Sequence, residues 1–229
     1  MVCTNDKKTG CSGSSSDHER DLQRLKDRIT ACRVCVETPI RQALPHQPRP
    51  VVVLSATARI AICGQAPGTR VHASGKPFTD PSGDRLRDWM GIDEDLFYDA
   101  SKLAIIPMGF CFPGLDSKGG DKPPRTECKR TWHTEVFSSM LQIETLLAIG
   151  GYAQAYHMPE LTKPRLWETI ADFRNIWDQT CERHAKGEGP RVLPLPHPSW
   201  RNNGHIKKNS WFENELLPIL KEEVDRLIY

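Results

Sequence analysis

Residues 64–83 read GQAPGTRVHASGKPFTDPSG and directly follow the apolar segment 58–63, ARIAIC. A short apolar segment with almost no charge is typical of a buried parallel strand. Gly64, Pro67 and Gly68 end this strand, and a polar loop leads to a helix that we expect to begin at Asp84. Open α/β sheets form their binding sites in loops at the carboxyl ends of parallel strands. The segment therefore predicts a site at 64–83, although an ordinary strand-to-helix connection has a similar composition.

The loop also has residues that suit a flat ligand. Gly64 and Gly68 allow the backbone to approach a ligand closely. Pro67 and Pro77 restrict the backbone, and Phe78 offers an aromatic face beside Pro77.

Strand-like and helix-like segments alternate along the chain. The expected strands are 58–63, 102–107, 145–150 and 191–197, and the expected helices are 18–29, 84–90, 93–100, 126–141, 164–182 and 211–227. Prolines in the last strand favour an edge position. The alternation predicts a three-layer α/β domain with a parallel sheet. Residues 1–17 are rich in Ser, Gly and Lys and are predicted to be a disordered tail, so the folded domain is expected at 18–229.

Length and composition exclude several classes of protein. The 229 residues suit one domain with a substantial core, and 38% of them are hydrophobic without a run that could span a membrane. The amino terminus lacks the apolar segment of a secretion signal, so we expect a cytoplasmic protein. Its eight cysteines are then expected to be thiols or metal ligands rather than disulfides. The net charge of +2 is too small to indicate a nucleic-acid partner by itself.

A possible metal site is formed by a CxxC motif, Cys32 and Cys35, together with the more distant Cys111 and Cys128. Four thiolates can enclose a zinc ion or a [4Fe–4S] cluster. The wide separation of the second pair favours a cluster, because zinc sites more often use two CxxC pairs. Four unrelated buried cysteines would show the same spacing.

Residues 197–209, HPSWRNNGHIKKN, form the last informative segment. His197 ends the fourth expected strand, and Trp200 and Arg201 follow it. Positive charge beside an aromatic side chain suits a nucleic-acid backbone and an unstacked base. We therefore predict that Trp200, Arg201, Lys207 and Lys208 contact a nucleic acid, although a solvated basic loop has the same composition.

These motifs together resemble the uracil-DNA glycosylase superfamily. The resemblance rests on GQAPG, the Pro77-Phe78 pair, the four cysteines and the HPS triplet, and it covers roughly residues 28–225. It is closest to family 4, the iron–sulfur enzymes of bacteria and archaea. It implies a three-layer α/β/α fold with a central four-stranded parallel sheet. It also implies a [4Fe–4S] cluster on Cys32, Cys35, Cys111 and Cys128, and no nucleotide cofactor.

The resemblance further implies a monofunctional glycosylase that acts as a monomer on DNA containing uracil. Such an enzyme hydrolyses the N-glycosidic bond of a flipped deoxyuridine and starts base excision repair. His197 matches the histidine that stabilises the departing uracil anion. Phe78 matches the aromatic residue that stacks on the flipped base, and backbone groups around Gln65 and Ala66 would hold the pyrimidine edge.

The sequence departs from the family pattern at the position of the catalytic acid. Family 4 enzymes usually have a glutamate where Gln65 stands, and family 1 enzymes have an aspartate where Ala66 stands. Family 5 enzymes also lack this acid and have a similar Phe-Thr-x-Asp segment. Asp80 is therefore the predicted substitute that positions the water, and His72 is a second candidate. Either residue could instead stabilise the loop.

A second departure concerns base recognition. Pro107 stands where the superfamily commonly has an asparagine that reads uracil. Recognition is then expected to rest on backbone groups of Met108, Gly109 and Phe110. Two alternatives follow from these departures. The protein could act on other deaminated or damaged bases, or it could be a DNA-binding relative without catalytic activity.

Overall fold

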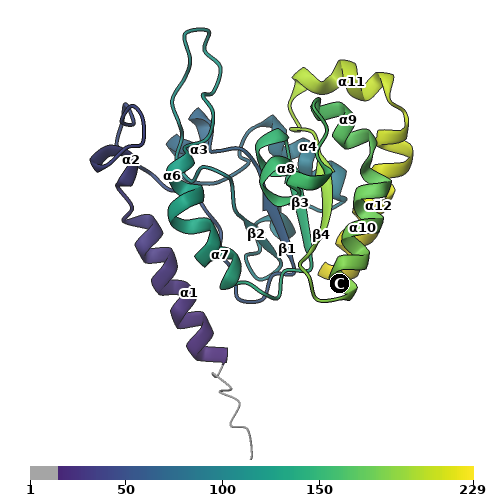
Figure 1. Ribbon diagram of the computed structural model, residues 1–229, viewed down its shortest axis with the longest axis horizontal. Coiled ribbons are helices and arrows are strands. Elements are labelled where there is room, and N and C mark those ends of the chain that lie inside the picture. Colours follow the sequence, from purple (N-terminus) through teal and green to yellow (C-terminus); the bar gives the residue numbers. More distant parts are fainter. Residues whose placement is uncertain (1–14) are drawn as a thin grey trace, which may run out of the picture.

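A computed structural model describes residues 15–229, and the predicted tail at 1–14 lies outside this range. Its centre is one parallel sheet in the order β2-β1-β3-β4 (Figure 1). The strands are β1 (Ile60–Cys63), β2 (Leu103–Ile105), β3 (Thr145–Ile149) and β4 (Arg191–Leu195). All three strand pairings are parallel, as predicted, and β4 lies at an edge. The predicted fold class is therefore confirmed.

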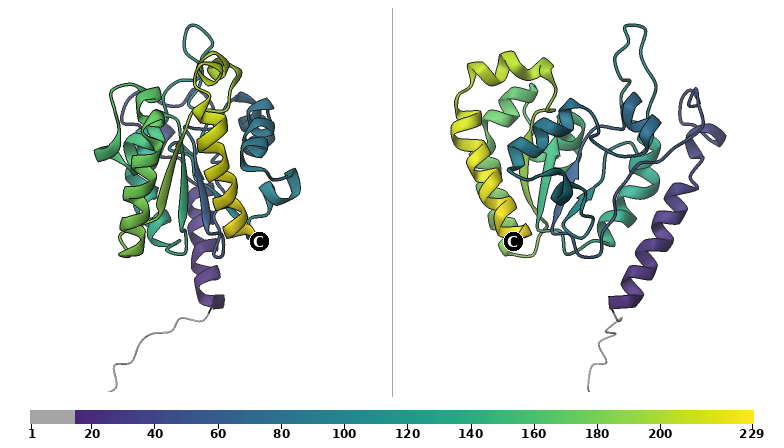
Figure 2. Two further views of the ribbon diagram at one scale, coloured as in Figure 1. Left: turned by 90° about the vertical axis from the view of Figure 1, so that its right-hand side faces the viewer. Right: turned by 180° about the vertical axis from the view of Figure 1, so that it is seen from behind.

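The two faces of the sheet carry separate halves of the core. Ile60 and Ile62 of β1 contribute to one half, whereas Ala61 and Cys63 contribute to the other. Such alternation follows from the two-residue repeat of a strand. Both faces are covered, so all four residues of β1 are buried. Figure 2 shows helices on both sides of the sheet, as expected for three layers.

Different helices supply the two halves. α1 (Ser15–Thr30), α8 (Gly151–His157) and the segment 126–140 pack with Ala61 and Cys63. α4 (Pro81–Met90), α5 (Glu94–Tyr98), α9 (Leu166–Ala171) and α12 (Leu217–Ile228) pack with Ile60 and Ile62, and α10 (Phe173–Ala185) contributes to both halves. The predicted apolar stripe of α1, Leu22, Leu25 and Ile29, is buried.

Several predicted boundaries are wrong. α1 begins at Ser15, inside the predicted tail, and α4 begins at Pro81, because proline fits the first turn of a helix. The helix predicted at 126–141 is α6 (Thr126–Cys128), a π-helical turn at Lys129–His133, and α7 (Thr134–Ser138). The helix predicted at 164–182 is divided between α9 and α10, and the last one includes a π-helical turn at Phe212–Leu216.

Short helices also occupy segments that were predicted to be loops. They are α2 (Val34–Glu37), α3 (Thr69–Ser74), α8, α11 (Asn203–Lys208) and the 3₁₀ turns Pro159–Leu161 and Trp200–Asn202. Helices of this length have too few turns to show a clear apolar repeat. Within residues 15–229, no helix is both long enough and apolar enough to cross a membrane.

Candidate active site

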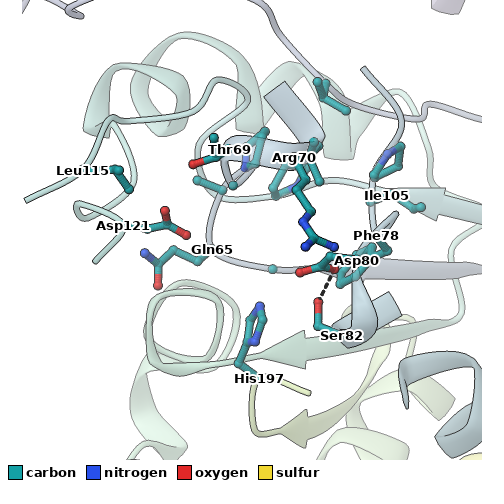
Figure 3. A pocket seen from close by; sticks show the side chains of 18 of the residues that line it. Gln65, Thr69, Arg70, Phe78, Asp80, Ser82, Ile105, Leu115, Asp121 and His197 are labelled. Carbon is teal, nitrogen blue, oxygen red and sulfur yellow. Dashed lines mark hydrogen bonds between the residues drawn. The ribbon is translucent and has the colours of Figure 1, made fainter. Parts of the chain in front are cut away.

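A cavity of about 350 Å³, which we call the inner cavity, lies beyond the carboxyl ends of β1, β2 and β4. Residues 64–71 and 77–82 form much of its wall, and His197 and Asp121 complete it from distant parts of the chain (Figure 3). This is where an open parallel sheet places its ligand. The volume suits one small flat group.

Phe78 lines the inner cavity in an unusual backbone conformation. Its φ is 54°, in the left-handed region that non-glycine residues rarely adopt. The Tyr98 hydroxyl lies 2.8 Å from the carbonyl oxygen of Pro77 and 3.1 Å from that of Phe78, so it can donate a hydrogen bond there. The Phe97 ring packs edge-on against Phe78 at 5.7 Å. Strain of this kind persists where the surroundings fix it, often at functional sites.

Gly83 explains why α4 can pack so closely against Phe78. A Cβ atom at position 83 would overlap the carbonyl oxygen of Phe78. A residue larger than glycine therefore cannot fit without moving the Phe78 backbone. The aromatic face predicted from the sequence is thus held firmly in the cavity wall.

His197 follows β4 and is exposed to the cavity. Its ring points toward the space between Gln65 and Asp121 on one side and Asp80 on the other (Figure 3). Desolvation by the surrounding protein lowers the pKa of His197, although the charges of Asp80 and Asp121 partly oppose this effect. The imidazole is therefore neutral at neutral pH. A neutral ring can donate one N–H to a ligand.

Asp80, the predicted water-positioning residue, lies in the cavity wall at the start of α4. Its Oδ1 accepts a hydrogen bond of 2.6 Å from the Ser82 hydroxyl. Figure 3 shows the Arg70 side chain pointing toward Asp80. The Asp80 Oδ1 is thus already engaged by the Ser82 hydroxyl two residues along the chain.

Asp121 is a cavity residue that sequence reasoning missed. It lies in the loop before α6, and it lines the inner cavity opposite Asp80. Desolvation raises the pKa of Asp121, while the charges of His197 and Arg201 oppose this rise. Nothing in the spacing of Asp121 from the motifs indicates this position, because it depends on how the loop folds back.

Gln65 and Ala66 both line the inner cavity, as predicted. The Gln65 side chain reaches across to the loop before α6, where its Nε2 donates to the Lys122 carbonyl at 3.2 Å. Its own carbonyl accepts a hydrogen bond of 2.9 Å from the Gly109 N–H. Gln65 thus joins two segments of the site.

The backbone N–H groups of Met108, Gly109 and Phe110, which we predicted to take part in base recognition, have partners inside the protein. Their N–H groups are donated to the Gly64 carbonyl, the Gln65 carbonyl and the Cys128 sulfur respectively. Pro107 lines the inner cavity, but Met108 and Gly109 do not. These two residues support the loop at 64–68 from below and have no N–H left for a base.

His72, the second candidate for water activation, is not a residue of the cavity wall. Its ring packs 4.4 Å from the His46 ring and 5.7 Å from the Phe112 ring. Within residues 15–229 its Nδ1 has no hydrogen-bond partner. The structure thus separates His72 from His197, and short helix α3, which contains His72, is the reason.

A wider outer cavity of about 760 Å³ continues from the inner one. Arg70, Arg85, Trp200 and Arg201 line it, and 74% of the Trp200 surface is exposed. Arg85 also braces the segment after β4, because it donates to the Ser199 carbonyl at 3.1 Å and to Asn203 Oδ1 at 2.6 Å. Sequence reasoning missed Arg70 and Arg85.

Lys207 and Lys208, which we predicted to bind DNA with Trp200, are exposed at the end of α11. They are not among the residues that line either cavity. In Figure 1, α11 projects from the same end of the molecule as the loop before α6. The two lysines are therefore placed beside the site rather than in it.

The four predicted metal ligands lie around one small cavity apart from the inner one. Cys32 ends the turn after α1, Cys35 is in α2, Cys111 follows β2 and Cys128 is in α6. The Cys32 sulfur accepts a hydrogen bond of 3.3 Å from Trp132 Nε1, and Cys128 accepts one from the Phe110 N–H. A hydrogen bond from Cys128 lowers the pKa of Cys35 to about 7, whereas burial raises that of Cys111 to about 12.

The chemistry of this donor set fits an iron–sulfur cluster, because such clusters are held by four thiolates that accept N–H hydrogen bonds. In residues 15–229, however, no group of three or more His, Cys, Asp or Glu side chains has the geometry of a metal site. The metal itself stays a prediction.

A comparison with known protein families identifies a matching family. Residues 51–221, well over half of the chain, match the family described as the Uracil DNA glycosylase superfamily. The matched range includes both cavities, Cys111 and Cys128, and it begins after Cys32 and Cys35.

Proposed function

The chain belongs to the uracil DNA glycosylase superfamily, and from this premise we propose that it is a monofunctional glycosylase acting on uracil in DNA. It hydrolyses the bond between deoxyribose C1′ and uracil N1, which leaves an abasic site and starts base excision repair. The observation that carries this proposal is the inner cavity, in which the Phe78 ring and the His197 imidazole share one space for a base.

A base can reach this cavity only after leaving the duplex stack, and such enzymes flip the target nucleotide. The uracil ring is proposed to stack on Phe78, whose backbone is fixed by Tyr98 and Gly83. Ala66 and Gln65 lie along the pyrimidine edge. A fixed aromatic face lowers the cost of ordering the bound base, because the protein does not rearrange.

Cleavage of the C1′–N1 bond leaves positive charge on the sugar and negative charge on the base. The bonding electron pair moves onto uracil, where a neutral His197 donates its N–H to the O2 oxygen. A donor aimed at developing charge is among the strongest contributions to catalysis. A water molecule adds to C1′, its proton passes to a carboxylate in the cavity, and the uracil anion later takes a proton from solvent.

The outer cavity suits the DNA around the flipped nucleotide. Trp200 offers an exposed ring that can enter the space vacated by the base, and Arg201 lies beside it with its guanidinium 6.0 Å from the ring centre. Arg70 and Arg85 add positive charge in the same cavity, where phosphates would lie. Lys207 and Lys208 are proposed to hold phosphates farther along the strand.

We also propose a [4Fe–4S] cluster on Cys32, Cys35, Cys111 and Cys128. When bound, it ties the amino-terminal segment to the loop before α6 and performs no step in base removal. Arg125 and Glu127 already connect these parts, because Arg125 donates to the Gln42 carbonyl at 2.6 Å and Glu127 accepts from the Ile40 N–H at 3.0 Å. Anaerobically purified protein should be brown and contain about four irons per chain. Colourless protein with stoichiometric zinc would contradict this.

One assay tests the proposed activity. A DNA oligonucleotide with one uracil is incubated with the protein, abasic sites are cleaved by alkali, and a thymine oligonucleotide is the control. Single strands, U:G pairs and U:A pairs define the substrate. Strand cleavage only after alkali supports a monofunctional glycosylase, and binding without uracil release would support a DNA-binding relative.

A sister activity on other deaminated bases is the second candidate, and one observation favours it. The N–H groups of Met108, Gly109 and Phe110 are used inside the protein. Fewer fixed donors therefore face the base than a uracil-specific site would need. Oligonucleotides with hypoxanthine or xanthine should be tested in parallel.

A further inference from the structure

We propose that Asp121 is the catalytic carboxylate that binds the attacking water and takes its proton. This inference rests on the proposed glycosylase function and names a residue outside the family motifs. Asp80 is then a structural residue of the opposite wall.

Asp121 lines both the inner and the outer cavity, as Asp80 does, so both carboxylates stand where a flipped nucleotide would pass from one to the other. The Asp121 Oδ2 lies 3.5 Å from the point that a Cβ on Gly68 would occupy. The carboxylate therefore sits directly above the GQAPG loop, in which neither Gln65 nor Ala66 is acidic.

The backbone of Asp121 is held in place by hydrogen bonds of the segment around it. Residues 114–122, which we call the hairpin, form an antiparallel bridge between Leu115 and Asp121. The Lys122 N–H donates to the Gly114 carbonyl at 3.0 Å, and Asp116 Oδ1 accepts from the Gly120 N–H at 2.9 Å. Gln65 then fixes the hairpin to the cavity through its bond to the Lys122 carbonyl. Gln65 stands where family 4 enzymes usually have the catalytic glutamate. Here its side chain instead holds Lys122, the residue next to Asp121.

The carboxylates of Asp80 and Asp121 differ in their hydrogen-bond partners. Asp80 accepts the Ser82 hydroxyl at 2.6 Å, and Arg70 points toward it. Among residues 15–229, the Asp121 carboxylate has no hydrogen-bond or ion-pair partner. Its exposed oxygens are therefore available to a water molecule. A general base must be within hydrogen-bond reach of the proton it accepts, and a carboxylate that already accepts hydrogen bonds is a weaker base because its charged form is stabilised.

The charges around Asp121 suit this task. His197, after β4, and Arg201, in the turn that follows, favour its ionised form, whereas Asp80 and Asp116 oppose it. Desolvation is the largest effect and raises its pKa. An ionised carboxylate with a raised pKa is a stronger base than an ordinary aspartate.

The C1′–N1 bond breaks first, and its electron pair leaves with uracil. The water oxygen then forms a bond to the cationic C1′. One water proton moves to an Asp121 oxygen and is later lost to solvent. Before attack, the same negative charge stabilises the cationic sugar.

The main test is a pair of isosteric variants, Asp121→Asn and Asp80→Asn, in single-turnover assays with uracil DNA. Asp178→Asn, an exposed change on α10, is the matched control. We expect Asp121→Asn to slow uracil release by roughly 10²–10³-fold and Asp80→Asn by less than about 10-fold. Asp121→Glu should restore part of the rate. A full-speed Asp121→Asn enzyme, or a larger loss in Asp80→Asn, would overturn the proposal.

The pH profile gives a second readout. The rate of the unaltered protein should fall as pH decreases through the raised pKa of Asp121, because the protonated carboxyl cannot accept a proton. Asp80→Asn should keep this fall, and Asp121→Asn should lose it. A fall that disappears only in Asp80→Asn contradicts the assignment.

A binding measurement separates this inference from the proposed function. DNA with a protonated pyrrolidine in place of the sugar mimics the cation, and DNA with an uncharged tetrahydrofuran is its control. Asp121→Asn should weaken binding of the pyrrolidine DNA by about 10-fold or more, with tetrahydrofuran DNA unaffected. If the unaltered protein releases no uracil, the proposed function fails. The binding comparison still tests whether the Asp121 carboxylate lies next to the sugar. Equal loss of affinity for the pyrrolidine DNA and the tetrahydrofuran DNA would overturn that position.

Discussion

The two walls of the inner cavity are built in different ways. Residues 77–83, the stacking wall, are fixed by the Tyr98 hydroxyl, by the edge of Phe97 and by the close approach of α4 at Gly83. The opposite wall consists of His197 and the hairpin, which a few hydrogen bonds hold. The first wall is packed from behind, and the second presents ionisable groups to the cavity. This difference indicates a division of work between holding a base and performing chemistry on it.

The largest effect is expected from a change that breaks the stacking wall. Gly83→Ala places a Cβ on the carbonyl oxygen of Phe78, which is backbone and cannot move aside as a side chain would. Overpacking typically costs about 1–3 kcal/mol and occasionally more, and the upper end is expected where the overlap is with backbone. We expect a clear decrease in the thermal unfolding temperature and loss of measurable uracil release.

Gly204→Ala is the matched control, because a Cβ at position 204 meets nothing within 4 Å. It should unfold at or above the temperature of the unaltered protein, since alanine favours a helix over glycine. If Gly83→Ala and Gly204→Ala unfold alike, the stacking wall is not tightly packed.

A change in the opposite wall should remove chemistry without removing the fold. His197→Ala deletes the donor to the uracil anion, and loss of one such donor costs roughly 10²–10³-fold in rate. Because His197 is exposed to the cavity, the unfolding temperature should change little. Single-turnover rates and DNA binding should be measured together, and a loss confined to DNA binding would contradict this role.

The pH dependence of His197 has a definite sign. Burial lowers its pKa, so the neutral ring persists to a lower pH than for an ordinary histidine. If the neutral ring is the active form, its protonation should not limit the rate near neutral pH. A rate that falls as pH rises through this lowered pKa, below the ordinary value of 6.5, would show that the cation is required.

A smaller effect is expected from a variant that removes one hydrogen bond from the stacking wall and leaves its packing intact. Tyr98→Phe keeps the ring but removes the hydroxyl that lies near the Pro77 and Phe78 carbonyls. A hydrogen bond of this type contributes about 1 kcal/mol, so uracil release should fall about fivefold. Fluorescent base analogues opposite an abasic site would report whether base stacking, rather than the chemical step, is altered.

The stacking wall could be predicted from the sequence, whereas the position of the hairpin could not, because the two depend on different kinds of contact. Strand β1 and the GQAPG loop are adjacent in sequence, so the local pattern also gave the position of Gln65 and Phe78. The parallel sheet followed from apolar segments alternating with helices. The position of Asp121 depends on the Leu115–Asp121 bridge and on Gln65, which are contacts between distant residues.

The same limit applies to Met108 and Gly109. The sequence does not show that the Gly64 and Gln65 carbonyls accept their N–H groups. Nor did it show that short helix α3 holds His72 against His46 and Phe112. Hydrogen-bond partners between segments are decided by tertiary packing, which a local pattern does not contain.

The smallest effect on catalysis is expected at Lys207 and Lys208, which lie outside both walls. Changing both to alanine should weaken binding of all DNA sequences alike, because phosphate contacts carry no sequence information. Each lost contact releases fewer counterions, so the slope of log affinity against log salt should fall by about one per lysine on duplex DNA. The single-turnover rate at saturating protein should stay unchanged, since neither side chain lines a cavity.

Arg201→Ala is the informative comparison, because Arg201 lines the outer cavity and contributes to the charge around Asp121. It should alter the rate as well as the affinity. An unchanged salt slope in the double lysine variant would place the DNA path over the hairpin side of the cavity instead of over α11.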